Sequence, residues 1–168
     1  MGVRSVARNQ RRTEQFNSFY SCGVTIMRIL LVDDDISSVS ALANLLQHEH
    51  TLRIASNGVD ALHAFEVADF DTVITDIKMP KMNGIDLLKA IRNAGKTAEV
   101  IIITGFPNKG HIADAEKYRA RAFFTKPINV ERFMDILRRI EGELDHAKQS
   151  GASSAAGEQT TTDDMPHC

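Results

Sequence analysis

The chain has 168 residues, of which 43% are hydrophobic and 25% charged, and its formal net charge is −2. This length is enough for one domain with a sizeable core but not for two, and the hydrophobic fraction excludes a wholly disordered chain. The small net charge gives no indication of nucleic-acid binding. The two cysteines, Cys22 and Cys168, lie near the ends of the chain, so no disulfide framework is expected and a reducing compartment suits them.

The two ends of the chain differ in composition from its middle. Residues 1–26 contain four arginines and one acid but no apolar core of the secretory type, which excludes a signal peptide. We expect a disordered leader or a mis-assigned start, with an organellar transit peptide as the less favoured alternative. Residues 147–168 are rich in Ser, Ala, Gly and Thr and predict a flexible tail without a second folded domain. The folded domain is therefore expected over 27–146.

Apolar β-rich runs alternate with helical patterns five times between these ends. The alternation predicts a parallel sheet with helices on both faces and right-handed crossovers. The predicted strands lie near 28–32, 52–55, 72–75, 99–103 and 122–124, and the predicted helices near 37–48, 58–68, 84–93, 109–119 and 129–145.

Three consecutive acids, Asp33, Asp34 and Asp35, follow the apolar run 29–32. Two unit charges 4 Å apart repel by about 4 kcal/mol at an effective dielectric constant near 20, so such a cluster requires a nearby cation. Carboxylates of this kind suit Mg²⁺, which keeps several waters and binds one or two carboxylates together with a phosphate. The triplet therefore predicts a Mg²⁺-assisted phosphate site.

Three further predicted strands end in polar side chains: Asp76, Thr104 and Lys126. Pro80 and Gly84 follow Asp76, and proline ends a strand ladder whereas glycine permits a tight turn. We therefore expect Asp76 to lie at the mouth of a structured loop.

These motifs resemble the receiver (CheY-like) domain of two-component response regulators. The matching segments are VDD at 32–34, TDIKMPKMNG at 75–84, IIITG at 101–105 and FFTKP at 123–127. The resemblance covers about 27–146 and implies a flavodoxin-like, doubly wound, five-stranded parallel sheet of order 2-1-3-4-5. Ligands of such a sheet bind at the carboxyl ends of the strands, where all four motifs are predicted to lie.

The resemblance also implies the metal ligands. Asp76 is then the phosphoacceptor and a ligand of Mg²⁺. Asp33 and Asp34 form the acid pair, with Asp34 as the direct ligand, and the backbone carbonyl of Lys78 completes the coordination sphere.

By the same resemblance, Thr104 binds a phosphoryl oxygen and Lys126 pairs with the phosphoryl group. Thr104 and Phe123 are then the switch residues, although Phe123 also suits an ordinary core position. The surface expected to change is formed by the fourth helix, fifth strand and fifth helix, about 109–140. Lys78 and Phe106 flank the expected phosphate and are candidates for controlling the access of water.

The implied function is that of a stand-alone, single-domain, cytoplasmic response regulator. It is not an enzyme in the usual sense, since it catalyses its own phosphorylation and dephosphorylation. The expected partners are a sensor histidine kinase or histidine phosphotransfer protein and a downstream target protein, with no direct nucleic-acid or membrane binding. Small phosphodonors are expected to serve as well.

Two alternatives belong to other functional classes. The segment 33–37 also fits the nucleophile motif of haloacid-dehalogenase-type phosphatases, but these enzymes require a later acid pair, and the pair Asp163-Asp164 lies in the polar tail. That family also leaves Asp76 with Pro80 and Gly84 unexplained. The other alternative is a receiver-like docking module that is never phosphorylated, against which the intact acids and lysine argue.

Several polar residues have local structural interpretations. Asp35 is expected to form a cap or turn, Ser37 or Ser38 is a candidate cap of the first helix, and Asn129 of the last. His48 and His50 are expected at the surface near a helix end, and the dispersed histidines predict no metal cluster.

Overall fold

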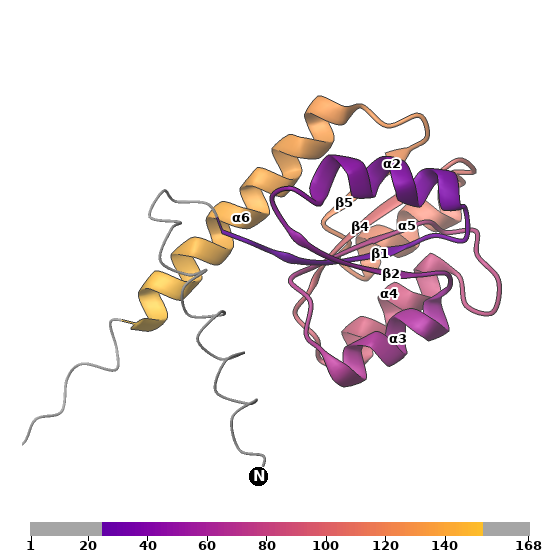
Figure 1. Cartoon of the computed structure of the whole chain (residues 1–168). Coiled ribbons are helices and arrows are strands. Elements are labelled where there is room, and N and C mark those ends of the chain that lie inside the picture. Colours follow the sequence, from indigo (N-terminus) through magenta and orange to yellow (C-terminus); the bar gives the residue numbers. More distant parts are fainter. Residues whose placement is uncertain (1–24, 153–168) are drawn as a thin grey trace, which may run out of the picture.

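The computed structural model describes residues 25–152, and within them five parallel strands form one sheet of order β2-β1-β3-β4-β5 (Figure 1). This order and the helices on both faces confirm the flavodoxin-like fold. The strands are β1 (Arg28–Val32), β2 (Thr51–Ala55), β3 (Thr72–Thr75), β4 (Glu99–Thr104) and β5 (Ala122–Thr125). The helices are α2 (Ile36–Leu46), α3 (Gly58–Val67), α4 (Gly84–Asn93), α5 (Lys109–Lys117) and α6 (Val130–Ala152).

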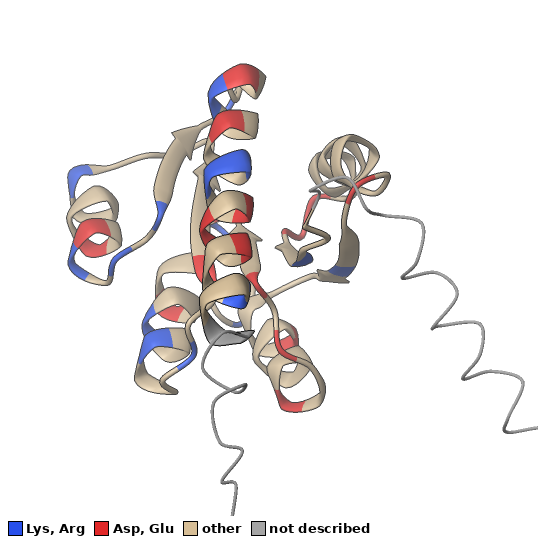
Figure 2. Cartoon of the chain, turned by 90° about the vertical axis from the view of Figure 1, so that its left-hand side faces the viewer, with Lys and Arg blue, Asp and Glu red and all other residues tan. Residues whose placement is uncertain are grey.

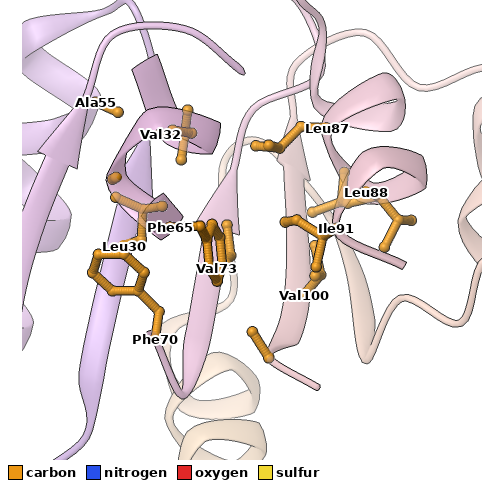
Figure 3. Close-up of a cluster of buried hydrophobic side chains, with 14 of the residues drawn as sticks. Leu30, Val32, Ala55, Phe65, Phe70, Val73, Leu87, Leu88, Ile91 and Val100 are labelled. Carbon is orange, nitrogen blue, oxygen red and sulfur yellow. The ribbon is translucent and has the colours of Figure 1, made fainter. Parts of the chain in front are cut away.

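Alternation of side chains along the strands divides the core into two layers. Leu30 and Val32 point to the face covered by α3, α4 and α5, where the larger cluster of buried side chains lies (Figure 3). Ile29 and Leu31 point to the other face, which α2 and α6 cover. Burying one such aliphatic side chain contributes about 1.5–3 kcal/mol, so the two layers together hold the strand ends in place.

Helix α6 is longer than expected, since it runs to Ala152 instead of ending near residue 145. Its apolar positions Phe133, Leu137 and Ile140 pack on the sheet. Figure 2 shows that basic and acidic residues are interspersed along this helix. No helix of residues 25–152 is long and apolar enough to cross a membrane. The expected leader as far as residue 24, the cysteines and Asp163-Asp164 lie outside the described residues.

His50 is buried, contrary to the prediction of a surface position, whereas His48 is exposed as expected. The chain turns inward after α2, so that the His50 side chain, 1% exposed, lies with Nε2 3.2 Å from Glu141 Oε1 on α6. Burial lowers the pKa of His50 and raises the pKa of Glu141. The contact therefore joins the turn before β2 to α6 across the second layer.

Arg92 joins the carboxyl-terminal ends of two neighbouring helices. Its guanidinium donates to the carbonyl oxygens of Ala98 at 2.8 Å, Arg119 at 3.0 Å and Tyr118 at 3.2 Å. Ala98 precedes β4, and Tyr118 and Arg119 follow α5. The end of α5 is thus fixed to the end of α4 by hydrogen bonds from a single side chain.

Candidate functional site

The strand register brings the four predicted side chains to one edge of the sheet. Val32 pairs with Thr75, and Thr104 pairs with Thr125. Asp33, Asp76 and Lys126 each follow directly on one of these strands, and Thr104 is the last residue of β4. Because parallel strands end at the same edge, the four polar groups lie together at the carboxyl ends.

Lys126 lies between two carboxylates. Its Nζ is 2.8 Å from Asp33 Oδ2 and 3.5 Å from Asp76 Oδ2. Burial alone lowers the pKa of Lys126, but its hydrogen bond to Asp33 and the charges of Asp33 and Asp76 outweigh burial and raise the pKa. Lys126 is therefore held in its charged form, and the acids are neutralised in part by a cation on the chain itself.

The acid pair offers oxygen atoms in two different environments. Asp33 is 7% exposed and its Oδ1 accepts a hydrogen bond from the Asp35 N–H at 2.9 Å, whereas Asp34 is exposed. Among residues 25–152, no three His, Cys, Asp or Glu side chains are arranged to enclose a metal ion. An open set of hard oxygen ligands nevertheless fits Mg²⁺, which keeps part of its water shell.

Asp76 begins residues 76–84, termed the acceptor loop after the predicted role of Asp76, and is fixed by hydrogen bonds to its backbone and side chain. The Asp76 N–H donates to Val32 O at 2.9 Å, Thr75 Oγ1 donates to Asp76 O at 2.8 Å, and Asp76 Oδ1 accepts from the Ile77 N–H at 2.6 Å. A Cβ on Gly84 would overlap the Asp76 carbonyl oxygen. Glycine is therefore required at 84 by close approach to Asp76.

Gly84 is the first residue of α4 and does not form the tight turn of this loop. Within the loop, the positive φ of 64° belongs to Lys81, a conformation that few residues other than glycine adopt. The structured loop predicted from Pro80 and Gly84 is present, but the tight-turn role assigned to Gly84 is wrong.

Thr104 and Phe123 lie on the sheet behind the acids. The Thr104 side chain is buried, and its Oγ1 accepts a hydrogen bond from the Phe106 N–H at 3.2 Å. Lys126 N–H donates to Thr104 O at 2.8 Å. Phe123 is partly buried against the larger core cluster. The hydrogen bond from the Phe106 N–H to Thr104 Oγ1 ties the start of the segment before α5 to Thr104.

Lys78 and Phe106 approach one another beside the acceptor. The Lys78 Nζ lies 4.8 Å from the centre of the Phe106 ring, and this ring is otherwise largely exposed. A cation over an aromatic face at this distance is attracted to it. The contact links the acceptor loop to the segment that precedes α5.

The first turn of α2 supplies a contact to Lys126 that the sequence did not predict. Asp35 is the N-cap, as expected, and accepts from the Ser37 and Ser38 N–H groups at 3.1 and 3.2 Å. Ser37 and Ser38, the candidate caps, are therefore donors to the cap. The Ser38 hydroxyl donates to Asp35 Oδ2 at 2.7 Å and accepts from Lys126 Nζ at 3.1 Å. At the last helix, Asn129 Oδ1 accepts from the Arg132 N–H at 2.9 Å, which confirms the expected cap.

A family model described as response regulator receiver domain matches residues 29–138. The transcriptional regulatory protein ZraR of Salmonella typhimurium is 33% identical over 125 residues, which cover 74% of this chain and 28% of ZraR. The chemotaxis protein CheY of Listeria monocytogenes is 28% identical over 116 residues, which cover 68% of this chain and 98% of CheY. The chain thus spans between 24% and 49% of the length of several transcriptional regulators that it matches.

Solved structures agree with these matches. A CheY-like response regulator receiver domain protein from Methanospirillum hungatei is 28% identical with a TM-score of 0.65, and the match covers 75% of this chain and 99% of that one. The signal receiver domain of an HD domain-containing protein from Pseudomonas fluorescens is also 28% identical, with a TM-score of 0.67 over 73% and 99% of the two chains.

Proposed function

The chain belongs to the response regulator receiver family, and on that premise we propose that it accepts a phosphoryl group on Asp76. The donor is a phosphohistidine of a sensor histidine kinase or phosphotransfer protein. The observation that carries this proposal is the position of Lys126 Nζ, 2.8 Å from Asp33 and 3.5 Å from Asp76 at the carboxyl edge of the sheet.

The transfer makes one bond and breaks one. An Asp76 carboxylate oxygen attacks phosphorus and forms an acyl phosphate, while the P–N bond of the donor breaks and its electron pair returns to the imidazole nitrogen. Positioning and charge neutralisation carry most of the catalysis in such reactions. Lys126 contributes a fixed positive charge beside the acceptor oxygen, and the Thr104 hydroxyl binds a phosphoryl oxygen.

The residues that would hold Mg²⁺ are Asp33, Asp34 and Asp76, with the backbone carbonyl of Lys78. When bound, the ion neutralises charge on the transferring phosphoryl group. The protein itself holds these oxygens in position before the ion binds. The hydrogen bonds of the Asp76 backbone to Val32 and Thr75 contribute by fixing the Asp76 backbone.

The output surface in this proposal is formed by α5, β5 and α6. Thr104 drawn toward the phosphoryl group moves the segment before α5, and the partly buried Phe123 changes its packing behind it. A downstream protein, or another part of a longer chain, then binds the altered surface.

The test is the intact mass of the protein after incubation with a small phosphodonor, with and without Mg²⁺. We expect a Mg²⁺-dependent gain of one phosphoryl group that the Asp76→Asn variant does not show. No adduct with small donors or candidate kinases would instead favour the docking module. Phosphate release that persists in Asp76→Asn but is lost in Asp33→Asn would favour the phosphatase.

A further inference from the structure

The hydroxyl of Ser38 lies between the cap of α2 and the ammonium group of Lys126. It is 2.7 Å from Asp35 Oδ2 and 3.1 Å from Lys126 Nζ. The two residues in contact, Ser38 and Lys126, are separated by 88 positions in the chain. The contact therefore joins the first turn of α2 to the residue that follows β5.

The chemistry of the two groups determines the direction of both hydrogen bonds. An ionised carboxylate only accepts hydrogen bonds, and a hydroxyl has a single proton, so the Ser38 O–H donates its one hydrogen bond to Asp35. Its oxygen is then an acceptor for Lys126. The short contact of 2.7 Å between Ser38 Oγ and Asp35 Oδ2 keeps the hydroxyl oriented in this way.

The Lys126 ammonium then has three acceptor groups around it: it donates hydrogen bonds to Asp33 and Ser38 and forms a longer ion pair, of 3.5 Å, with Asp76. The Lys126 side chain is nevertheless 30% exposed, because it lines an open groove of about 320 Å³ between α2 and the segment after β5. Water in this groove competes for the ammonium protons, and a long lysine side chain has many rotamers. A third fixed acceptor restricts these alternatives.

We propose that Ser38 is a positioning residue that holds the Lys126 ammonium between Asp33 and Asp76. The inference rests on the proposed function of Asp76 and adds to it a residue from α2 that does not touch the phosphoryl group. Asp35 has a second role in this arrangement beyond capping, since it orients the Ser38 hydroxyl.

Ser37 provides a matched control in the same turn. Both serines donate their backbone N–H to Asp35 at nearly equal distances, 3.1 and 3.2 Å. The Lys126 ammonium contacts the side chain of Ser38. A substitution that acts only through the start of α2 therefore has similar effects at both positions, whereas a positioning role is confined to Ser38.

The first measurement is the exchange of the Lys126 ammonium protons with water, followed by NMR in the unphosphorylated full chain. We expect about three- to tenfold faster exchange in Ser38→Ala, because one hydrogen bond to a charged group is lost. Ser38→Thr keeps the hydroxyl and, like Ser37→Ala, is expected to remain within about twofold of the wild type.

The second measurement is the rate of phosphoryl gain from a small phosphodonor at saturating Mg²⁺. We expect about a three- to tenfold decrease in Ser38→Ala, with recovery in Ser38→Thr. Unchanged ammonium exchange in Ser38→Ala, or an equal change in Ser37→Ala, would overturn the proposal. If even the wild type gains no phosphoryl group, the proposed function fails, while the ammonium exchange still decides the role of Ser38.

Discussion

Helices α4 and α5 cover the same face of the sheet and contact one another, but different forces hold them there. Half of the ten residues of α4 are buried, among them Leu87, Leu88 and Ile91. Of the nine residues of α5, Ala115 is the buried one. Besides the packing of Ala115, α5 has polar contacts to α4, such as Lys89 Nζ to Asp114 Oδ2 at 3.2 Å.

The difference in packing between α4 and α5 corresponds to the part of the predicted site that precedes each helix. Helix α4 begins at Gly84, directly against the Asp76 carbonyl, so its deep packing fixes the acceptor. Helix α5 begins after the segment that Thr104 holds by a single hydrogen bond. Elements with few buried apolar contacts open and move at the lowest free energy. The fold thus combines a rigid helix next to Asp76 with a weakly held one beside Thr104.

The largest expected effect is on folding stability. Leu88→Ala removes a fully buried side chain of α4 and is expected to lower the free energy of unfolding by about 3 kcal/mol. Ile112→Ala in α5, where the side chain is 40% exposed, is expected to cost less than about 1 kcal/mol. Urea unfolding measures both values, and equal losses would contradict the difference between the two helices.

Two glycines give the next contrast. Gly84→Ala places a methyl group on the Asp76 carbonyl oxygen and is expected to cost about 2 kcal/mol and to slow phosphorylation more than about tenfold. Gly110, near the start of α5, is less closely confined, since a Cβ there would meet Asn108 Oδ1 at 3.2 Å and would displace it by only a few tenths of an ångström.

Gly110→Ala is therefore expected to change the free energy of unfolding by less than about 1 kcal/mol, because the gain in helix propensity is offset by the displacement of the capping oxygen of Asn108. Urea unfolding and the rate of phosphoryl gain provide the comparison. A normal rate in Gly84→Ala would show that the acceptor loop tolerates displacement.

A smaller effect on folding stability is expected from the protonation of His50, and it concerns α4 and α5 equally. Burial lowers its folded pKa below 6.5, so the unfolded state binds the proton first and stability declines as the pH falls from about 6.5 toward the folded pKa. The raised pKa of Glu141 acts in the opposite sense, since its contribution is present below about 4.5 and is lost as the pH rises through its folded pKa.

We expect the wild type to lose more stability than His50→Gln between pH 7 and 5.5, by at most about 1 kcal/mol. His50 lies on the face covered by α6, so amide exchange in α4 and α5 is expected to rise together. A rise confined to α5 would argue against this.

The smallest effect concerns the link between the two regions. Lys78 precedes α4 and Phe106 precedes α5, and the Lys78 Nζ lies 4.8 Å from the centre of the Phe106 ring. An exposed contact of this kind is worth about 0.5–1 kcal/mol. Lys78→Ala and Phe106→Ala are each expected to shorten the lifetime of the acyl phosphate about two- to fivefold.

The decay of the phosphorylated mass gives this lifetime, and Lys109→Ala, an exposed lysine of α5, is the control. A lifetime of only seconds in the wild type would contradict a protective role for Lys78.

The positions of Asp33, Asp76, Thr104 and Lys126 could be predicted because each ends an apolar strand, and parallel strands end at one edge. The Ser38–Lys126 contact could not, since it depends on how α2 lies relative to β5. The burial of His50 likewise depends on α6 passing over the turn before β2. Residues 146–150 of the α6 extension are exposed, so a hydrophobic pattern does not reveal them as helical.

The hydrogen bonds from Arg92 have a mechanical consequence. They hold the carbonyls of Tyr118 and Arg119 at 3.2 and 3.0 Å, at the end of α5 far from Thr104. A helix of this length is roughly 13 Å long, so with one end held by Arg92 it can rotate as a rigid body about that end. A rotation of about 10° about that point displaces the other end by roughly 2 Å. A movement of the segment after Thr104 is therefore largest at the start of α5 and smallest near Arg92, and this change of shape is one that a partner protein can detect.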